Sequence, residues 1–234
     1  MTKKLLMLVA TIAIATSAMA QSAFEGFYGQ IGAGYENNTI NSNSSKDSGI
    51  NNPLNNPSVS NGNGQLNLGL GYNYAVSQNW LLGLGAEYST ISSTLNSGQV
   101  TSISCSGACG SINQFKVSNR YSIFLSPSYV LEKNSAIYAK AGYTNQKIQE
   151  TIVETTAPYD ANNNAKVSST VSGYILGLGY KQIIQGGLYG FVEANYYSYS
   201  GANLNFKFPL GDVISNNNPT SSAYSALVGV GYKF

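Results

Sequence analysis

Apolar and polar residues alternate along the last eleven residues of the chain, Tyr224–Phe234. Every second residue from Tyr224 onward is apolar or aromatic, and the residues between them are small or polar apart from Leu227. A β-strand projects successive side chains to opposite faces, so the pattern predicts a strand with one apolar face that ends in aromatic residues. Because the alternation runs to Phe234, we expect this strand to be part of the fold itself.

The same alternation recurs upstream and predicts seven more strands, at 27–36, 65–74, 80–89, 120–129, 137–144, 174–181 and 188–196. Each approaches the roughly 9–11 residues that a tilted strand needs to cross a bilayer. Pro127 removes one ladder hydrogen bond from the fourth segment, and we expect a β-bulge there.

The connections between these segments alternate in length. Long ones are predicted near 37–63, 93–116, 151–168 and 200–222, and short ones near 75–79, 132–135 and 182–187. This alternation is typical of up-and-down barrels in an outer membrane, with short turns and both termini on the periplasmic side. The first long connection is rich in Asn, Ser and Gly, lacks periodicity and is expected to be mobile.

Two features of the segments indicate which face meets lipid. Aromatic residues stand at the ends of the apolar faces, where interfacial girdles form. The opposite faces carry Gly, Ser and four single charges, at Glu87, Arg120, Lys140 and Glu193. Turning a strand over would expose such charges to lipid, at a cost of roughly 2–4 kcal/mol for a Lys or Arg near the midplane. An open edge in hydrocarbon would also leave backbone groups unpaired, so the sheet must close.

The segments therefore predict an all-β fold, an eight-stranded antiparallel up-and-down transmembrane β-barrel. A soluble secreted β-barrel is the alternative. Residues 1–20 are predicted to be a signal peptide, because Lys3 and Lys4 precede a short apolar run and Ala18–Ala20 fits the small-residue cleavage rule. The barrel domain then occupies residues 21–234, and its localisation is the bacterial outer membrane.

Charge excludes one class of partner. The chain has 12 Lys and Arg against 10 Asp and Glu, and removal of Lys3 and Lys4 leaves ten of each sign. A neutral mature chain has no electrostatic footprint for nucleic acid.

The terminal strand, the eight segments and the signal together resemble the outer-membrane β-barrel family of OmpA-like and opacity-like proteins. In that family the aromatic-ended last strand is an assembly signal for the barrel insertion machinery, and the matching positions are Tyr232 and Phe234. The resemblance implies outer-membrane lipids and the barrel assembly machinery as partners, and we expect a monomer.

Several barrels of this architecture are enzymes, so catalysis is a candidate function. The lipid A palmitoyltransferase, the lipid A deacylase, the outer-membrane phospholipase and the surface protease resemble it and use a catalytic His, whereas this chain has no His. A carboxylate pair such as Glu87 and Glu193 is the remaining option. We predict no catalytic residues, no cofactor and no metal site.

The inward charges Glu87, Arg120, Lys140 and Glu193 have two interpretations. They form a salt-bridge network that plugs the barrel, since buried charges must be paired, or they line a narrow pore. Eight strands leave little free lumen, which favours the plug. We expect Glu87 to pair with Arg120 on the neighbouring strand.

Two cysteines, Cys105 and Cys109, stand four residues apart in the second long connection. In an exported protein such a pair predicts a local disulfide, with free thiols as the alternative. The function predicted is a structural or surface-contact role through the external loops, and the alternative is a narrow porin-like channel for small solutes. The loops either bind ligands or act as hydrophilic shielding.

Overall fold

The structure is a computed structural model that describes residues 22–41, 45–47, 53–54, 58–101, 110–154, 165–207, 213–216 and 218–234. Strands account for most of these residues: β1 Gly26–Asn41, β2 Ser45–Asp47, β3 Pro53–Leu54, β4 Val59–Ala75, β5 Trp80–Ser89, β6 Ser93–Thr101, β7 Gly110–Glu132, β8 Ser135–Glu154, β9 Ala165–Gln185, β10 Leu188–Tyr199, β11 Leu204–Lys207, β12 Val213–Asn216 and β13 Thr220–Lys233. Within the described ranges, no helix has the length and apolar character needed to span a membrane.

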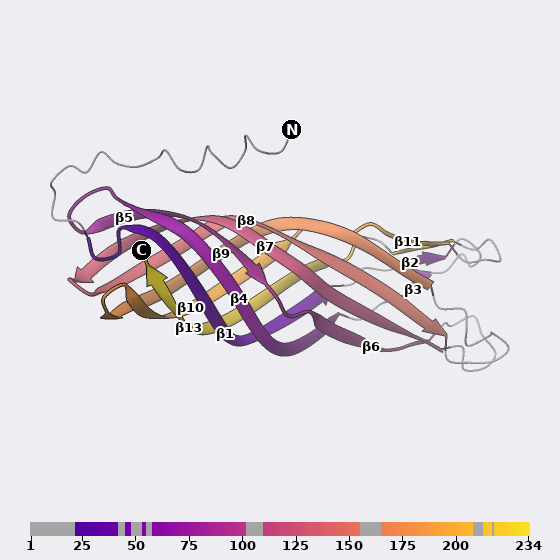
Figure 1. The fold of residues 1–234 in the computed structure, drawn as a ribbon. Helices are drawn as coiled ribbons and strands as arrows, with labels where there is room; N and C mark the ends of the chain where they lie inside the picture. The colour runs from indigo at the N-terminus through magenta and orange to yellow at the C-terminus, as the bar shows by residue number, and fades with distance from the viewer. Residues whose placement is uncertain are drawn as a thin grey trace, which may run out of the picture.

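Nine of these strands form one closed antiparallel sheet. Their order is β5–β4–β1–β13–β10–β9–β8–β7–β6, and a further pairing of β5 with β7 closes the barrel (Figure 1). Strand β5 pairs with residues 120–129 of β7, whereas β6 pairs with residues 110–117, so these two strands follow one another in a single place beside β7. Because β5 and β6 share one position in the ring, the nine strands fill eight positions. The fold is therefore the predicted eight-stranded up-and-down barrel.

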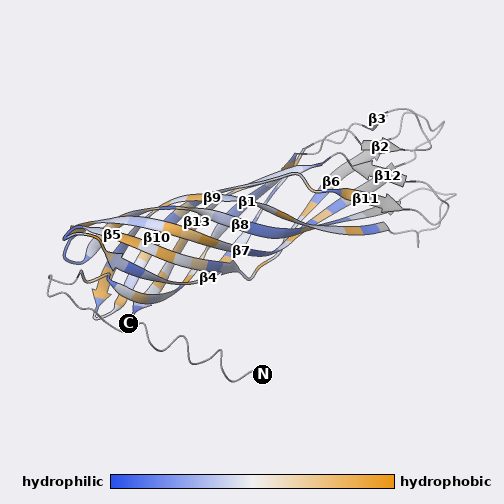
Figure 2. Ribbon diagram, turned by 90° about the horizontal axis from the view of Figure 1, so that it is seen from above, coloured by the Kyte–Doolittle hydropathy of each residue, from blue (hydrophilic) through white to orange (hydrophobic). Residues whose placement is uncertain are grey.

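Side-chain exposure follows the predicted alternation around the barrel. In β5, Leu82 and Leu84 are exposed, whereas Leu81 and Glu87 are buried. Figure 2 shows the resulting bands of apolar and polar residues along the strands. The exposed aromatic residues form two girdles, a lower one near the short turns (Phe27, Tyr72, Tyr74, Trp80, Tyr129, Tyr180, Tyr232 and Phe234) and an upper one (Tyr35, Tyr88, Tyr121, Tyr143, Tyr174 and Tyr224).

Several strands extend far beyond the segments that the alternation predicts. Strands β7, β8 and β9 have 23, 20 and 21 residues. The long connection predicted at 93–116 is wrong, because β6 and the start of β7 pair there as two arms of a hairpin. The ends of β8 and β9 likewise occupy residues 151–154 and 165–168 of the connection predicted at 151–168, where Ile152 pairs with Ala165.

The reason for this difference is that the hydrophobic pattern inverts above the upper girdle. Phe115, Ile148 and Val171 are buried there, while Lys116 and Lys147 on the same strands are exposed. The outer face meets water at this level and the inner face packs an apolar core, which is the opposite of the lipid-embedded part. A strand predicted from its apolar outer face therefore ends at the upper girdle, although the strand itself continues beyond it.

The remaining two long connections also contain strands. Strands β2 and β3 lie in the connection predicted at 37–63, and β11 and β12 lie in that predicted at 200–222. Together they form a separate four-stranded sheet in the order β11–β12–β2–β3, at the end of the barrel away from the C-terminus (Figure 1). The connection predicted at 37–63 therefore contains β2 and β3 as well as the end of β1 and the start of β4.

The bulge expected at Pro127 lies elsewhere. Leu125 pairs with Ala141 and Ser128 with Tyr138, so both strands advance by three residues and the register is kept. The register with β8 shifts instead between Ser118 and Tyr121, where Asn119 has a φ of 52°, and again between Val130 and Glu132 at the end of β7. Pro127 sits on the outer face and only interrupts the ladder to β8, whereas a left-handed Asn inserts a residue.

The chain ends inside the sheet. The backbone N–H of Phe234 donates to the carbonyl of Phe27 at 2.9 Å, and that of Lys233 donates to the carbonyl of Gly187 at 2.8 Å. The rings of Tyr232 and Phe234 lie edge to face with centroids 5.3 Å apart on the outer surface. The two hydrogen bonds fasten the end of β13 to β1 and to the turn between β9 and β10.

Candidate functional site

Lys140 is the centre of the polar network inside the barrel. It points inward from β8 with only 2% of its surface exposed. Its Nζ donates to Oε2 of Glu87 on β5 and to Oε1 of Glu193 on β10, each at 2.7 Å. Strand β7 separates β8 from β5 and strand β9 separates β8 from β10, so one ammonium group ties three non-adjacent strands across the lumen.

The two carboxylates around Lys140 receive further hydrogen bonds. Tyr138 Oη donates to Oε2 of Glu193 at 2.8 Å, and Asn195 Nδ2 donates to its Oε1 at 2.8 Å. The Nζ of Lys140 also lies 4.3 Å from the centre of the Phe124 ring. Two carboxylates facing one ammonium group leave an excess negative charge. The hydrogen bonds from Tyr138 and Asn195, together with the Lys140 ammonium group, offset the cost of burying this charge.

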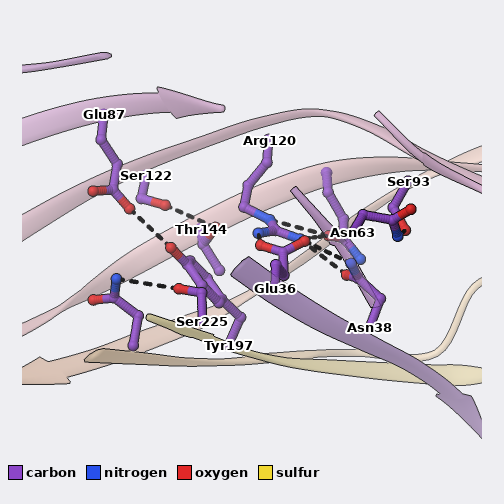
Figure 3. A network of polar contacts seen from close by, with 12 residues as sticks. Glu36, Asn38, Asn63, Glu87, Ser93, Arg120, Ser122, Thr144, Tyr197 and Ser225 are labelled. Atoms are coloured by element: carbon purple, nitrogen blue, oxygen red, sulfur yellow. Dashed lines mark hydrogen bonds and ion pairs between the residues drawn. The ribbon is translucent and has the colours of Figure 1, made fainter. Parts of the chain in front are cut away.

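Arg120 forms a second ion-pair cluster nearer the upper girdle. Its guanidinium binds both carboxylate oxygens of Glu36 on β1, with Nη2 to Oε1 at 2.9 Å. Asn38 accepts a bond from Nη2 at 3.1 Å, and Asn38 Nδ2 donates to Glu36 at 2.6 Å. Figure 3 shows Glu36, Asn38 and Arg120 meeting inside the barrel. A bidentate arginine–carboxylate pair of this kind has the strongest geometry for a buried charge.

The expected pairing of Glu87 with Arg120 is wrong. Arg120 lies opposite Ser89, two residues from Glu87 on the same strand, but its guanidinium extends across the lumen to Glu36. Glu87 is instead paired with Lys140. Tyr197 connects the two clusters, since its ring lies 4.4 Å from the Arg120 guanidinium carbon and its hydroxyl donates to Glu87 at 3.3 Å (Figure 3).

Apolar clusters close the network on both sides. Below it, Phe24 is inserted into the lumen with Leu81, Val130 and Ala136, and Asn73 Nδ2 holds its carbonyl at 3.0 Å. Above it lies a larger buried cluster, formed by Ile40, Leu95, Phe115, Val117, Phe124, Ile148, Val171, Ile175, Tyr197, Tyr199, Ala202, Leu204 and Ala223.

The cavity found between these layers, among the described residues, is small. A cavity beside Lys140, lined by Phe24, Tyr138, Glu193 and neighbouring side chains, has a volume of about 20 Å³. That is enough for about one water molecule. Glycines give room to the large inward rings: a Cβ on Gly229 would lie 2.6 Å from the ring of Phe191.

All four predicted lumen charges, Glu87, Arg120, Lys140 and Glu193, are buried inside the barrel. Sequence reasoning did not single out Glu36, Lys181 and Glu150, which are buried there as well. Glu36 and Lys181 lie on the same face of their strands as the inward-facing glycines. This alternation is the signal that could have identified them as lumen residues. The Nζ of Lys181 lies 5.0 Å from the Phe24 ring centre and 5.4 Å from that of Tyr138.

The remaining site predictions concern the ends of the chain and the cysteines. Tyr232 and Phe234 are exposed on the outer face, Phe234 to 76%, as their parity predicts. Cys105 and Cys109 lie outside the described residues, as does the predicted signal 1–20, and their predictions stand as made. Among the described side chains, no group of three or more His, Cys, Asp or Glu is arranged to hold a metal ion.

A closed barrel with an apolar belt between two aromatic girdles and a polar, ion-paired interior defines an integral outer-membrane protein. The sequence model of the outer membrane protein beta-barrel domain matches residues 6–234. The chain belongs to this family, and its location is the bacterial outer membrane.

Solved structures with this architecture share little sequence with the chain. The outer membrane protease OmpT from Escherichia coli superposes with a TM-score of 0.53 at 11% identity, covering 94% of this chain and 100% of that one. The outer membrane protein OprG from Pseudomonas aeruginosa gives 0.52 at 16%, covering 90% and 96%. At these identities the likeness concerns the fold alone. A comparison with curated protein sequences found no match.

Proposed function

We propose that this protein is a non-conducting barrel of the outer membrane, with a structural or surface-contact role through the loops at its upper end. The observation that carries the proposal is the filled lumen. Lys140 bridges Glu87 and Glu193 across the axis at 2.7 Å, and the cavity beside it holds about 20 Å³. A continuous water path needs more space than one water molecule occupies.

A catalytic role has less support. The chain has no His, the residue most often used as a base near neutral pH. The candidate carboxylates Glu87 and Glu193 are both engaged with Lys140, and they lie between the two apolar clusters rather than in an open cleft. The arrangement therefore favours stability of the barrel over chemistry.

Conductance of the refolded protein in a planar lipid bilayer tests the proposal. We expect no steady unitary current. A variant with Glu87, Lys140 and Glu193 all replaced by Ser removes the three bridging side chains, and any current gained by this variant would locate the seal at Lys140. Steady unitary steps from the unaltered protein would establish a narrow channel and contradict the proposal.

Surface contact further requires that the upper end faces outward. In the chain, Cys105 and Cys109 stand between Thr101 and Gly110, the paired ends of β6 and β7. A membrane-impermeant maleimide should label them in intact cells after mild reduction. The matched control is Lys133→Cys in a Cys105→Ser, Cys109→Ser background, because Lys133 is exposed in the short turn between β7 and β8. This variant should be labelled only after the cells are permeabilised.

A further inference from the structure

Lys181 on β9 is a buried lysine without an ionic partner. Only 8% of its surface is exposed, and it lies inside the barrel. The ion pairs found among the described residues use the other two buried cations, whereas the Nζ of Lys181 faces the rings of Phe24 and Tyr138 at 5.0 and 5.4 Å from their centres. Ring faces attract a cation but offer little to its three N–H donors, so the burial of this ammonium group is incompletely compensated.

The carboxylates of the Lys140 cluster are saturated by other donors. Glu87 and Glu193 each accept hydrogen bonds on both oxygens, from Lys140 and from tyrosine hydroxyls. Both form an ion pair with Lys140, and neither forms one with Lys181. Lys181 therefore balances the excess negative charge of this cluster only from a distance, and its own donors remain without an acceptor in the described part of the chain.

The small cavity in the lumen adjoins this lysine and is rich in positive charge. Its lining contains three cations, Lys140, Lys181 and Lys233, and one carboxylate, Glu193. Even when Glu87 is added as the second carboxylate bound to Lys140, three positive charges face two negative ones, so the net charge is +1. Charges of one sign inside a wall of low dielectric constant attract a small counter-ion.

Neutral donors and the size of the cavity narrow the choice of counter-ion. Gln30 accepts a hydrogen bond from Tyr189 through Oε1, which leaves its Nε2 group for another acceptor. Tyr28 adds a hydroxyl to the same lining. The volume is about 20 Å³, enough for one particle of the size of a water molecule. Polyatomic anions such as phosphate or sulfate are therefore too large for this space.

We propose that the cavity lined by Lys181 and Lys233 binds a single halide ion, such as chloride. The two lysines supply positive charge, and Gln30 and Tyr28 supply neutral donors. A halide in contact with the Lys181 ammonium group compensates a charge that is otherwise buried without an acceptor. A water molecule fits the same volume but brings no charge, and it is the alternative that the experiment must separate. The site does not depend on whether the barrel conducts.

Crystals of the refolded protein grown with sodium bromide test the proposal directly. Bromide is the probe because it is a halide that scatters X-rays anomalously. We expect an anomalous difference peak in contact with the Nζ of Lys181, and no peak at this place in crystals of Lys181→Met. Water density without an anomalous signal beside Lys181 would overturn the proposal.

Thermal unfolding in neutral detergent gives the matching measurement in solution. Sodium bromide is compared with sodium gluconate at equal ionic strength, because gluconate is too large for the cavity and controls for screening. At a tenfold excess of bromide over its dissociation constant, linkage raises the midpoint by roughly 3–6 °C. Lys181→Met should lose this shift. The matched control Lys133→Met removes an exposed charge from the short turn between β7 and β8 and should keep the shift.

The gel mobility shift between unheated and boiled samples first establishes that each variant is folded. If Lys181→Met does not fold, the unaltered protein in bromide and in gluconate still decides the question. A shift of equal size in gluconate, or in folded Lys181→Met, would contradict binding at this cavity. Anomalous density without a midpoint shift would mark an adventitious ion only, and it would also overturn the proposal.

Discussion

Arg120 and Glu36 meet across the interior of the barrel although β5 and β4 separate their strands in the closed sheet. The pair is bidentate, buried, and connected through Tyr197 to the Lys140 cluster. Because each ion pair joins distant strands, the network holds the barrel cross-section in addition to the ladder hydrogen bonds.

Replacement of Lys140 by Met should be the most damaging single change in the interior. It leaves Glu87 and Glu193 buried without their shared cation, and breaking a buried pair costs about 3–5 kcal/mol. Urea unfolding in detergent, followed by the gel mobility shift, would measure the loss. Adding Glu87→Gln and Glu193→Gln should recover much of it. A single variant as stable as the unaltered protein would show that the cluster does not support the barrel.

The Arg120–Glu36 pair can be tested by a double-mutant cycle. We expect the cycle of Arg120→Ala with Glu36→Ala to give a coupling of at least about 1 kcal/mol, within the range for contacting residues. The matched cycle of Arg120→Ala with Glu87→Ala should give a smaller coupling, since these two residues contact each other only through Tyr197. Equal couplings in the two cycles would contradict the specific pairing.

Asn119 gives a test of the bulge in β7. Its φ of 52° is disfavoured for most side chains, with a cost of roughly 1–2 kcal/mol. Asn119→Val should therefore destabilise the barrel by about this amount, whereas Asn119→Gly should be neutral within ~0.5 kcal/mol. Unfolding midpoints of the two variants give the comparison. A stable Val variant would mean that the bulge is not needed at this position.

Removal of Phe234 should reduce assembly more than export. The Phe234 ring packs on Tyr232 in the lower girdle, and its N–H closes the last hydrogen bond to β1. We expect less folded protein in outer-membrane fractions and more in the periplasm, as shown by immunoblots of unheated samples. Phe234→Tyr, which keeps an aromatic ring at the terminus, is the control. Normal levels of the truncated protein in the membrane would refute a role for this residue in assembly.

Local alternation was sufficient for the lipid-embedded part of the fold. Residues 80–89 were predicted as a strand with Glu87 inward, and β5 has these bounds and this orientation. The period of two and the high cost of a charge in lipid leave one orientation for each strand. The same rule does not hold above the girdle, where Lys116 faces out and Phe115 faces in, so the hairpin of β6 and β7 was predicted to be a loop.

The sequence by itself determined the eight segments that cross the membrane, the lipid-facing side of each and the inward direction of Glu87, Arg120, Lys140 and Glu193. Each of these follows from residues within one strand. Only the tertiary structure decided that Arg120 binds Glu36, that Lys140 serves two carboxylates and that the bulge lies at Asn119 rather than Pro127. Partner choice inside a closed barrel depends on strand tilt and stagger around the whole ring, and these bring together side chains that are distant both in sequence and along the sheet.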